Sequence, residues 1–214
     1  MLKAVIFDMD GVLTDTEPVH FRATNVVLAT VGRAMTWEQY APFIGRAEPE
    51  MWDYMRDHFG LDNSENAQGN AYSRAVLELL EEGTEAIPGA QRAVLSAKEA
   101  GLLTAVASSS RESWVLATLR GAGLLGEFDA IVAGDMVKRG KPDPEIFLAA
   151  AGMLMVQPSA CLVVEDSPHG IAAAAAAGMF AIGVRSRFEL DLAAADDVID
   201  SIADFRARDY LPQP

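Results

Sequence analysis

Short, strongly apolar runs recur along the chain, and their spacing most constrains the fold. Between most of them lie segments whose apolar residues recur with the period of a helix. Strands that alternate with helices predict an α/β fold with a parallel sheet, and runs that are apolar throughout fit a sheet covered on both faces. The expected strands are 4–7, 102–107, 130–132, 161–164 and 181–184, and the expected helices around them are 89–100, 110–122, 143–152 and 168–177.

Residues 16–83 break this alternation. Only helical patterns occur in this stretch, without the β-branched runs that mark a strand. Gly83 and Pro88 interrupt regular structure where it ends. We therefore expect a helical domain at 16–83, inserted into a core domain made of 1–15 and 84–214. The expected helices of the insertion are 17–31, 36–43, 48–59 and 65–82.

Several helix starts carry residues that cap helices. Serine and aspartate side chains accept hydrogen bonds from the first free N–H groups of a helix, and proline suits the first helical position. A glutamate three residues after a serine completes a capping box. The expected N-caps are Asp143 before Pro144, Ser167 before Pro168, and Ser109 with Glu112 as its capping-box partner.

The charge balance argues against a nucleic-acid partner. With 17 basic and 31 acidic residues the formal net charge is −14, whereas binding to nucleic-acid phosphates needs a basic surface. No apolar run is long enough to span a membrane, and the opening MLKAVIFDMDG lacks the layout of a secretory signal. The single cysteine, Cys161, excludes an internal disulfide and fits a reducing compartment. We expect a cytoplasmic monomer or weak homodimer with no membrane partner.

Four polar segments lie where expected strands end or expected helices begin. In an open parallel sheet, ligands bind at the carboxyl ends of the strands. These segments are therefore expected to converge, although about 150 residues separate the outermost two. They are Asp8 and Asp10 in DMDG, Ser108, Ser109 and Ser110 in AVASSS, Lys141 in GKPDP, and Glu165 and Asp166 in VVEDS.

Together these groups suit phosphoryl transfer. Four carboxylates in one crevice repel one another, and Lys141 supplies only one positive charge. Mg²⁺ is the expected second cation, because it prefers oxygen ligands and the company of phosphate. The hydroxyls of Ser108 and Ser109, with helix N-terminal N–H groups, can then cradle a phosphate. The hypothesis makes Asp8 the nucleophile and a metal ligand, and Asp10 the general acid and base.

Each segment alone also has a plainer interpretation. Two aspartates in a tight turn are commonly a solvated loop, serines before a helix a cap, and an acidic pair favourable charge at a helix start. A lone lysine is usually a surface residue. The occurrence of all four in order, at strand–helix junctions, favours a site. Asp15, in contrast, is expected to be structural, at a hinge or as a helix cap.

The segments DMDGVLTD, AVAS, GKPDP and VVEDS resemble, in this order, the four motifs of the haloacid dehalogenase-like (HAD) hydrolase superfamily. DTEPVHFRAT, GKPDPEIFLAAA and VVEDSPHGIAAAAAAGM are most similar to the subgroup of β-phosphoglucomutase and small phosphatases such as phosphoglycolate phosphatase. The resemblance implies a Rossmann-like core with a helical cap domain inserted after the first strand. It also implies a Mg²⁺ site and a phosphoryl site, the first made of Asp8, the Asp10 carbonyl and Asp166 with Glu165 nearby, the second of Ser108 and Lys141.

The resemblance implies a phosphatase acting on a small phosphorylated metabolite, such as a sugar phosphate or a phosphoglycolate-like acid. Haloacid dehalogenases lack the second aspartate, here Asp10, so its presence favours phosphoryl transfer over dehalogenation. The alternative is a sugar-phosphate mutase similar to β-phosphoglucomutase, whose cap supplies an arginine and a lysine. Arg46 is the candidate arginine, but 62–83 contains no lysine and only Arg74. His20, about one turn into the first helix of the insertion, is either a crevice residue or a surface histidine.

Overall fold

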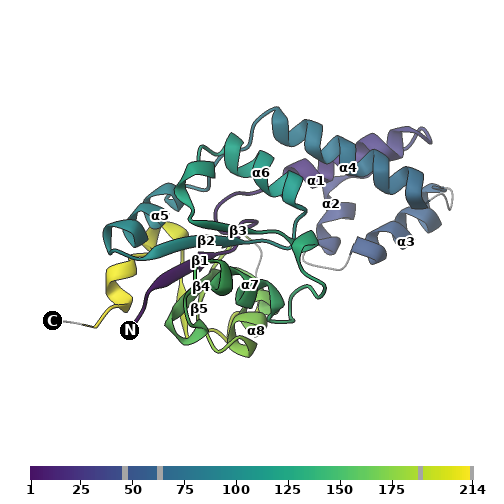
Figure 1. Ribbon diagram of the computed structural model, residues 1–214. Helices are drawn as coiled ribbons and strands as arrows, with labels where there is room; N and C mark the ends of the chain where they lie inside the picture. Colours follow the sequence, from purple (N-terminus) through teal and green to yellow (C-terminus); the bar gives the residue numbers. More distant parts are fainter. Residues whose placement is uncertain (45–47, 62–64, 188–189, 213–214) are drawn as a thin grey trace. The chain divides into compact units, whose positions relative to one another are not determined.

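The computed structural model describes residues 1–44, 48–61, 65–187 and 190–212 (Figure 1). These residues belong to two structural units. The larger unit, the core, consists of residues 1–15 and 84–214, and the smaller unit, the cap, consists of residues 16–83.

Six parallel strands form one sheet in the core, in the order β3-β2-β1-β4-β5-β6 (Figure 1). In β1, Phe7 lies beside Val106 of β2 and Val164 of β4. The strand order reverses between β1 and β4, and ligands bind at the carboxyl ends of the strands at such a switch point. The strands are β1 Ala4–Phe7, β2 Leu103–Ala107, β3 Ala130–Val132, β4 Cys161–Glu165, β5 Phe180–Val184 and β6 Asp197–Ile199.

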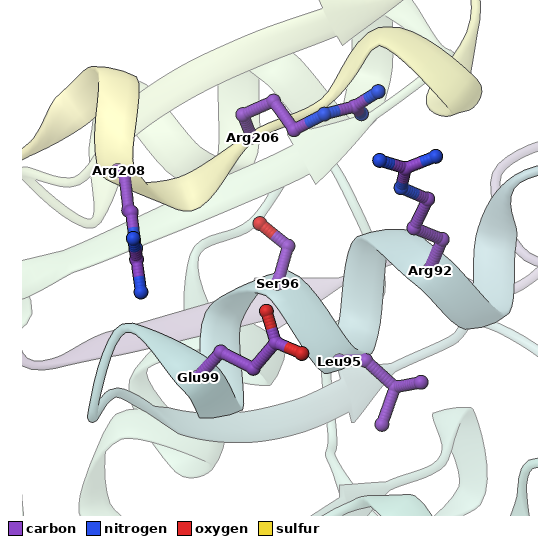
Figure 2. Close-up of a pocket in the computed structure, with 6 residues that line it drawn as sticks. All are labelled: Arg92, Leu95, Ser96, Glu99, Arg206 and Arg208. Carbon is purple, nitrogen blue, oxygen red and sulfur yellow. The ribbon is translucent and has the colours of Figure 1, made fainter.

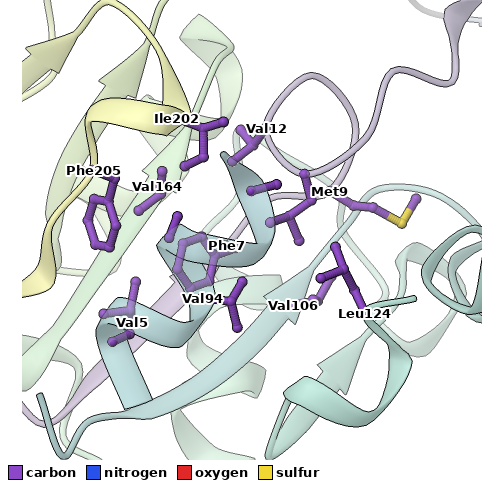
Figure 3. Close-up of a cluster of buried hydrophobic side chains, with 14 of the residues drawn as sticks. Val5, Phe7, Met9, Val12, Val94, Val106, Leu124, Val164, Ile202 and Phe205 are labelled. Carbon is purple, nitrogen blue, oxygen red and sulfur yellow. The ribbon is translucent and has the colours of Figure 1, made fainter. Parts of the chain in front are cut away.

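Helices cover both faces of this sheet. Val5 and Phe7 of β1 belong to a buried cluster with α5, α6 and the C-terminal segment, part of which is drawn in Figure 3. Ala4 and Ile6 belong to a second buried cluster with α7 and α8, because successive strand residues face opposite sides. The helices are α5 Ala90–Glu99, α6 Glu112–Gly121, α7 Glu145–Met153 and α8 Pro168–Ala176, with short 3₁₀ helices η2 Leu125–Glu127, η3 Gly134–Met136, η4 Pro158–Ala160, η5 Ile202–Asp204 and η6 Ala207–Tyr210. The predicted α/β fold with a parallel sheet is confirmed.

The described residues of the cap are helical, without a strand. Its first and last helices, α1 and α4, pack against each other, and Arg22 of α1 forms an ion pair of 2.8 Å with Glu82 just after α4. The helices are α1 Glu17–Ala29, α2 Trp37–Tyr40, η1 Ala41–Phe43, α3 Glu48–Phe59 and α4 Glu65–Glu81. In the part of the chain that the structure describes, no helix has the length and apolar character needed to cross a membrane.

Two of the three predicted helix caps differ from the structure. Ser167 accepts a hydrogen bond from the Gly170 N–H and caps α8, as predicted. The capping box at Ser109 is wrong, since α6 begins at Glu112 and Arg111 is its N-cap. Helix α7 begins at Glu145 rather than Pro144, although Asp143 still accepts a hydrogen bond from the Glu145 N–H.

Candidate active site

The first acidic loop leaves the central strand β1 at the switch point. Asp8 continues the strand ladder, because its N–H donates to the Val164 carbonyl of β4 at 2.9 Å. Met9 belongs to the buried apolar cluster that Figure 3 shows in part. Asp8 and Asp10, on either side of Met9, therefore point away from that cluster. The chain then turns at Gly11, whose φ of +88° lies in the left-handed region that favours glycine. This local geometry places both carboxylates at the carboxyl end of the sheet.

Lys141 joins the first acidic loop to the loop after β4. Its Nζ donates to Asp8 Oδ1, to Glu165 Oε1 at 2.7 Å and to the Ala107 carbonyl at 3.1 Å. Only 6% of the lysine side chain is exposed, and its Nζ lies 4.9 Å from the centre of the Phe147 ring. Lys141 therefore gathers groups from the ends of β1, β2 and β4 around one buried positive charge.

Asp10 is held by the serines that follow β2. Ser108 Oγ donates to Asp10 Oδ2 at 3.2 Å, and Ser110 Oγ donates to the same oxygen at 3.1 Å. The Ser110 N–H also donates to Ser108 Oγ at 3.0 Å, which fixes the loop. Ser109, which the sequence suggested beside Ser108, is exposed and lies between the two inward-facing serines. Ser110 belongs to the predicted polar segment AVASSS, but the predicted phosphate cradle consisted of Ser108 and Ser109.

The acidic pair after β4 completes the cluster. Asp8, Glu165 and Asp166 are 6%, 1% and 9% exposed, so all three carboxylates are removed from bulk water. Glu165 also accepts a hydrogen bond of 2.6 Å from the Ser167 N–H. A Cβ placed on Gly11 would overlap the Asp166 carboxylate, so the turn of the first acidic loop lies directly against Asp166. Residues from the first and the last of the four polar segments thus meet at one place.

Negative charge exceeds positive charge in this cluster. Burial raises the pKa of Asp8 well above its ordinary value; Lys141 opposes this rise, whereas Glu165, Asp10 and Asp166 add to it. Burial, followed by the charge of Glu165, raises the pKa of Asp166 to about 7. Burial would lower the pKa of Lys141, but Asp8 and Glu165 outweigh that effect and raise it, so the ammonium stays charged. One lysine does not compensate the surrounding carboxylates.

The oxygen atoms at this place are of the chemical kind that Mg²⁺ binds. Among the described residues, no group of three or more His, Cys, Asp or Glu side chains is placed so that it could hold a metal ion. Mg²⁺ does not require one, because it is commonly bound by one or two carboxylates together with water and substrate phosphate. Asp8 and Asp166, with the Asp10 carbonyl, are the groups that can hold it, and the excess negative charge is the observation that favours a cation there.

The remaining sequence candidates lie in or near the cap. His20 of α1 is stacked on Tyr72 of α4, and its Nδ1 lies 2.9 Å from the Tyr72 hydroxyl. Arg46 lies outside the described residues. Asp15, at the end of the first core segment, forms an exposed ion pair of 2.9 Å with Arg187, and it does not cap the first helix, because the N-cap of α1 is Thr16.

Comparisons with known proteins point to one family. The model of a family described as haloacid dehalogenase-like hydrolase matches residues 2–178. A phosphorylated carbohydrates phosphatase of Thermotoga maritima is 37% identical over 182 residues, which cover 83% of this chain and 82% of the relative. A β-phosphoglucomutase of Bacillus subtilis is 34% identical over 192 residues, covering 86% of this chain and 83% of the relative. The crystal structure of CbbY from Rhodobacter sphaeroides in complex with phosphate has a TM-score of 0.81 and 31% identity, covering 95% of this chain and 96% of that chain.

Proposed function

The chain belongs to the haloacid dehalogenase-like hydrolase family, and we propose that it is a Mg²⁺-dependent phosphatase that hydrolyses a small phosphorylated metabolite through an aspartyl-phosphate on Asp8. The observation that carries this proposal is the contact of Lys141 with both Asp8 and Glu165, beside an Asp10 held by two serines. A nucleophile, a positive charge and a second carboxyl group are thereby brought to one edge of the sheet. The proposed substrate is a sugar phosphate or a phosphoglycolate-like acid.

In the first half-reaction, Asp8 and Asp10 act on opposite sides of the phosphoryl group. A carboxylate oxygen of Asp8 forms a bond to phosphorus while the bond from phosphorus to the leaving oxygen breaks. Asp10, in its protonated form, gives its proton to that leaving oxygen, and the alcohol product departs. Lys141 opposes the rise that burial causes in the pKa of Asp8, which favours the carboxylate form, and it places one positive charge beside the transferring group.

In the second half-reaction, the same two residues reverse their roles. Asp10, now a carboxylate, takes a proton from a water molecule, and the water oxygen bonds to phosphorus. The bond between phosphorus and Asp8 breaks, which releases inorganic phosphate and restores both carboxyl groups. Ser108 and Ser110 keep Asp10 in position for both proton transfers. A Mg²⁺ ion held by Asp8, Asp166 and the Asp10 carbonyl would supply charge neutralisation for the phosphoryl oxygens.

A substrate panel tests this proposal directly. Purified protein with Mg²⁺ should release inorganic phosphate from at least one member of a panel of sugar phosphates and small organic acid phosphates, and the release should stop when the metal is chelated. The Asp8→Asn variant, purified in parallel, is the matched control for contaminating phosphatases. Phosphate release no faster than in that control, for every compound tested, would reject the proposed activity.

A sugar-phosphate mutase is the second candidate, favoured by the 34% identity to the Bacillus subtilis β-phosphoglucomutase. The segment 62–83 of the cap, however, carries Arg74 as its only basic residue, which is little positive charge for a second phosphate. A mutase primed with a sugar bisphosphate should convert β-glucose 1-phosphate into glucose 6-phosphate without net release of phosphate. Release of phosphate without the isomer excludes the mutase.

The buried carboxylates also predict how pH and Mg²⁺ affect stability. Asp166 has a pKa of about 7 in the folded protein, against about 4 in an unfolded chain, so the native state holds its proton more tightly. The tighter proton binding therefore contributes about 4 kcal/mol to the free energy of unfolding. This contribution is fully present below about pH 4 and is lost as the pH rises to about 7. The melting temperature of metal-free protein should therefore fall by several degrees between pH 5 and pH 8. Added Mg²⁺ should raise it more at pH 8 than at pH 5, because the carboxylates are then ionised.

Thermal unfolding followed by circular dichroism measures both effects. The Asp166→Asn variant provides the comparison, since its neutral amide removes the charge that becomes unfavourable at pH 8. It should lose much of the pH dependence and respond weakly to Mg²⁺. An equal response to Mg²⁺ at pH 5 and pH 8 in the unmodified protein would contradict the assignment of these carboxylates to a metal site.

A further inference from the structure

A pocket lies in the core unit, between helix α5 and the C-terminal segment (Figure 2). Its volume is about 320 Å³. None of its lining residues belongs to the candidate active site, and α5 precedes β2, whereas the active-site serines follow β2. The lining residues are Arg92, Leu95, Ser96 and Glu99 of α5, with Arg206 and Arg208 of the C-terminal segment.

The charge of this pocket is opposite to that of the protein. Three arginines face one glutamate here, in a chain whose formal net charge is −14. Two exposed arginines elsewhere in the core are paired with acids, Arg139 with Asp143 and Arg185 with Asp200. Within the described ranges of the chain, none of the three pocket arginines forms an ion pair with a carboxylate. Positive charge therefore exceeds negative charge among the side chains that line this pocket.

The two walls of the pocket are fixed to each other. Ser96 Oγ of α5 accepts a hydrogen bond of 2.9 Å from the Ala207 N–H, which ties the C-terminal segment to the helix. Phe205 and Ala207 are fully buried in the same cluster as the inner face of α5. Arg206 is oriented by hydrogen bonds of 2.7 Å from its Nη1 to the carbonyls of Ala203 and Phe205. Binding a ligand between these walls would require little reorganisation of the backbone.

The side chains around this rigid frame present a mixed surface. In Figure 2, Arg92 points from α5 toward the C-terminal segment, Arg206 extends toward Arg92, and Arg208 points back toward α5. Leu95 is 39% exposed and supplies an apolar surface at one side, while Glu99 supplies an acceptor at the other. Guanidinium groups match the oxygens of a phosphate through paired N–H donors, and such charge-assisted hydrogen bonds are stronger than neutral ones.

From this geometry we infer that the pocket is a second anion site, which binds the phosphate dianion of a small phosphorylated compound independently of catalysis. The phosphate oxygens contact Arg92, Arg206 and Arg208. The carbon part of the ligand covers Leu95, and a hydroxyl group of the ligand donates to Glu99. Inorganic phosphate can make the contacts with the three arginines. It has no carbon part to cover Leu95 and no alcohol hydroxyl to donate to Glu99.

Arginine side-chain NMR distinguishes binding in this pocket from binding in the active site. Inorganic phosphate is titrated into the ¹⁵N-labelled, Mg²⁺-loaded full chain at pH 8, and the arginine Nε–Hε resonances are followed. The resonances of Arg92, Arg206 and Arg208 should shift together with one saturating dissociation constant. Arg33 and Arg120, which are exposed arginines outside the pocket, should shift weakly or not at all. Hydroxymethylphosphonate forms a second arm: tighter binding than phosphate indicates an organic ligand, and equal binding indicates the free ion.

Two double variants complete the test. Arg92→Gln with Arg208→Gln should raise the dissociation constant for phosphate, measured from the Arg206 resonance, at least about tenfold, because two charge-assisted donors are lost. Arg33→Gln with Arg120→Gln removes the same charge elsewhere and should change this dissociation constant less than about twofold. Both double variants should retain catalytic phosphate release, since they leave the active site intact. Non-saturating shifts, or equal weakening in the two double variants, would overturn the proposal.

Discussion

Asp8→Asn should lower the rate of phosphate release by at least about 10⁴-fold, because it removes the proposed nucleophile while preserving the size of the side chain. The amide has no carboxylate lone pair with which to form the bond to phosphorus. It also removes one of the two carboxylates that contact Lys141, leaving Glu165 as the remaining partner. Steady-state phosphate release with the best substrate of the panel measures the loss.

Stability separates this chemical effect from misfolding. Because burial and neighbouring negative charges raise the pKa of Asp8, a neutral amide at this position should be tolerated by the fold. The thermal unfolding midpoint of Asp8→Asn should therefore stay close to that of the unmodified protein or exceed it.

Asp15→Asn is the matched control for Asp8→Asn. Asp15 lies in the same loop region, and its contact with Arg187 is an exposed ion pair, the kind that contributes little to stability. The same chemical change there should alter turnover less than about threefold. If Asp8→Asn retained a tenth or more of the activity, the aspartyl-phosphate mechanism would be wrong.

The sequence predicted the centre of the fold well, because the physical signal there is strong. Strands buried on both faces must be apolar throughout, and all five expected runs coincide with β1 to β5 within one residue at each end. The sixth strand, Asp197–Ile199, was not predicted. It has three residues, lies at the edge of the sheet and is partly exposed, so it carries no continuous apolar run.

The loops of the site were predictable as segments but not as contacts. Ser108 and Ser110 both face Asp10, and residues two apart at the end of a strand point to the same side, as Asp8 and Asp10 also can. That spacing favours Ser110 over Ser109, whose side chain is exposed. The contact of Lys141 with Glu165 depends on the packing of loops that are far apart in the sequence. Such contacts have no local signature.

Asp10→Asn tests the proposed proton transfers, and it should lower the release of phosphate from a sugar phosphate by about 10²–10⁴-fold. The asparagine can donate no proton to the departing alkoxide and can take none from water. A substrate that leaves as a stable anion, such as p-nitrophenyl phosphate, does not need the first proton transfer. The variant should therefore release about one equivalent of nitrophenolate rapidly and then turn over slowly, because hydrolysis of the Asp8 phosphate still needs the base.

This burst distinguishes a missing acid and base from a damaged site. The amide introduced by Asp10→Asn keeps an oxygen that can accept the hydrogen bonds of Ser108 and Ser110, and the backbone carbonyl is unchanged, so the loop should keep its shape. Asp8→Asn, by contrast, should show no burst with any leaving group, since the first bond to phosphorus cannot form. If Asp10→Asn slowed the first release of nitrophenolate as much as steady-state turnover, Asp10 would act through the geometry of the site and the assignment of both proton transfers to it would fail.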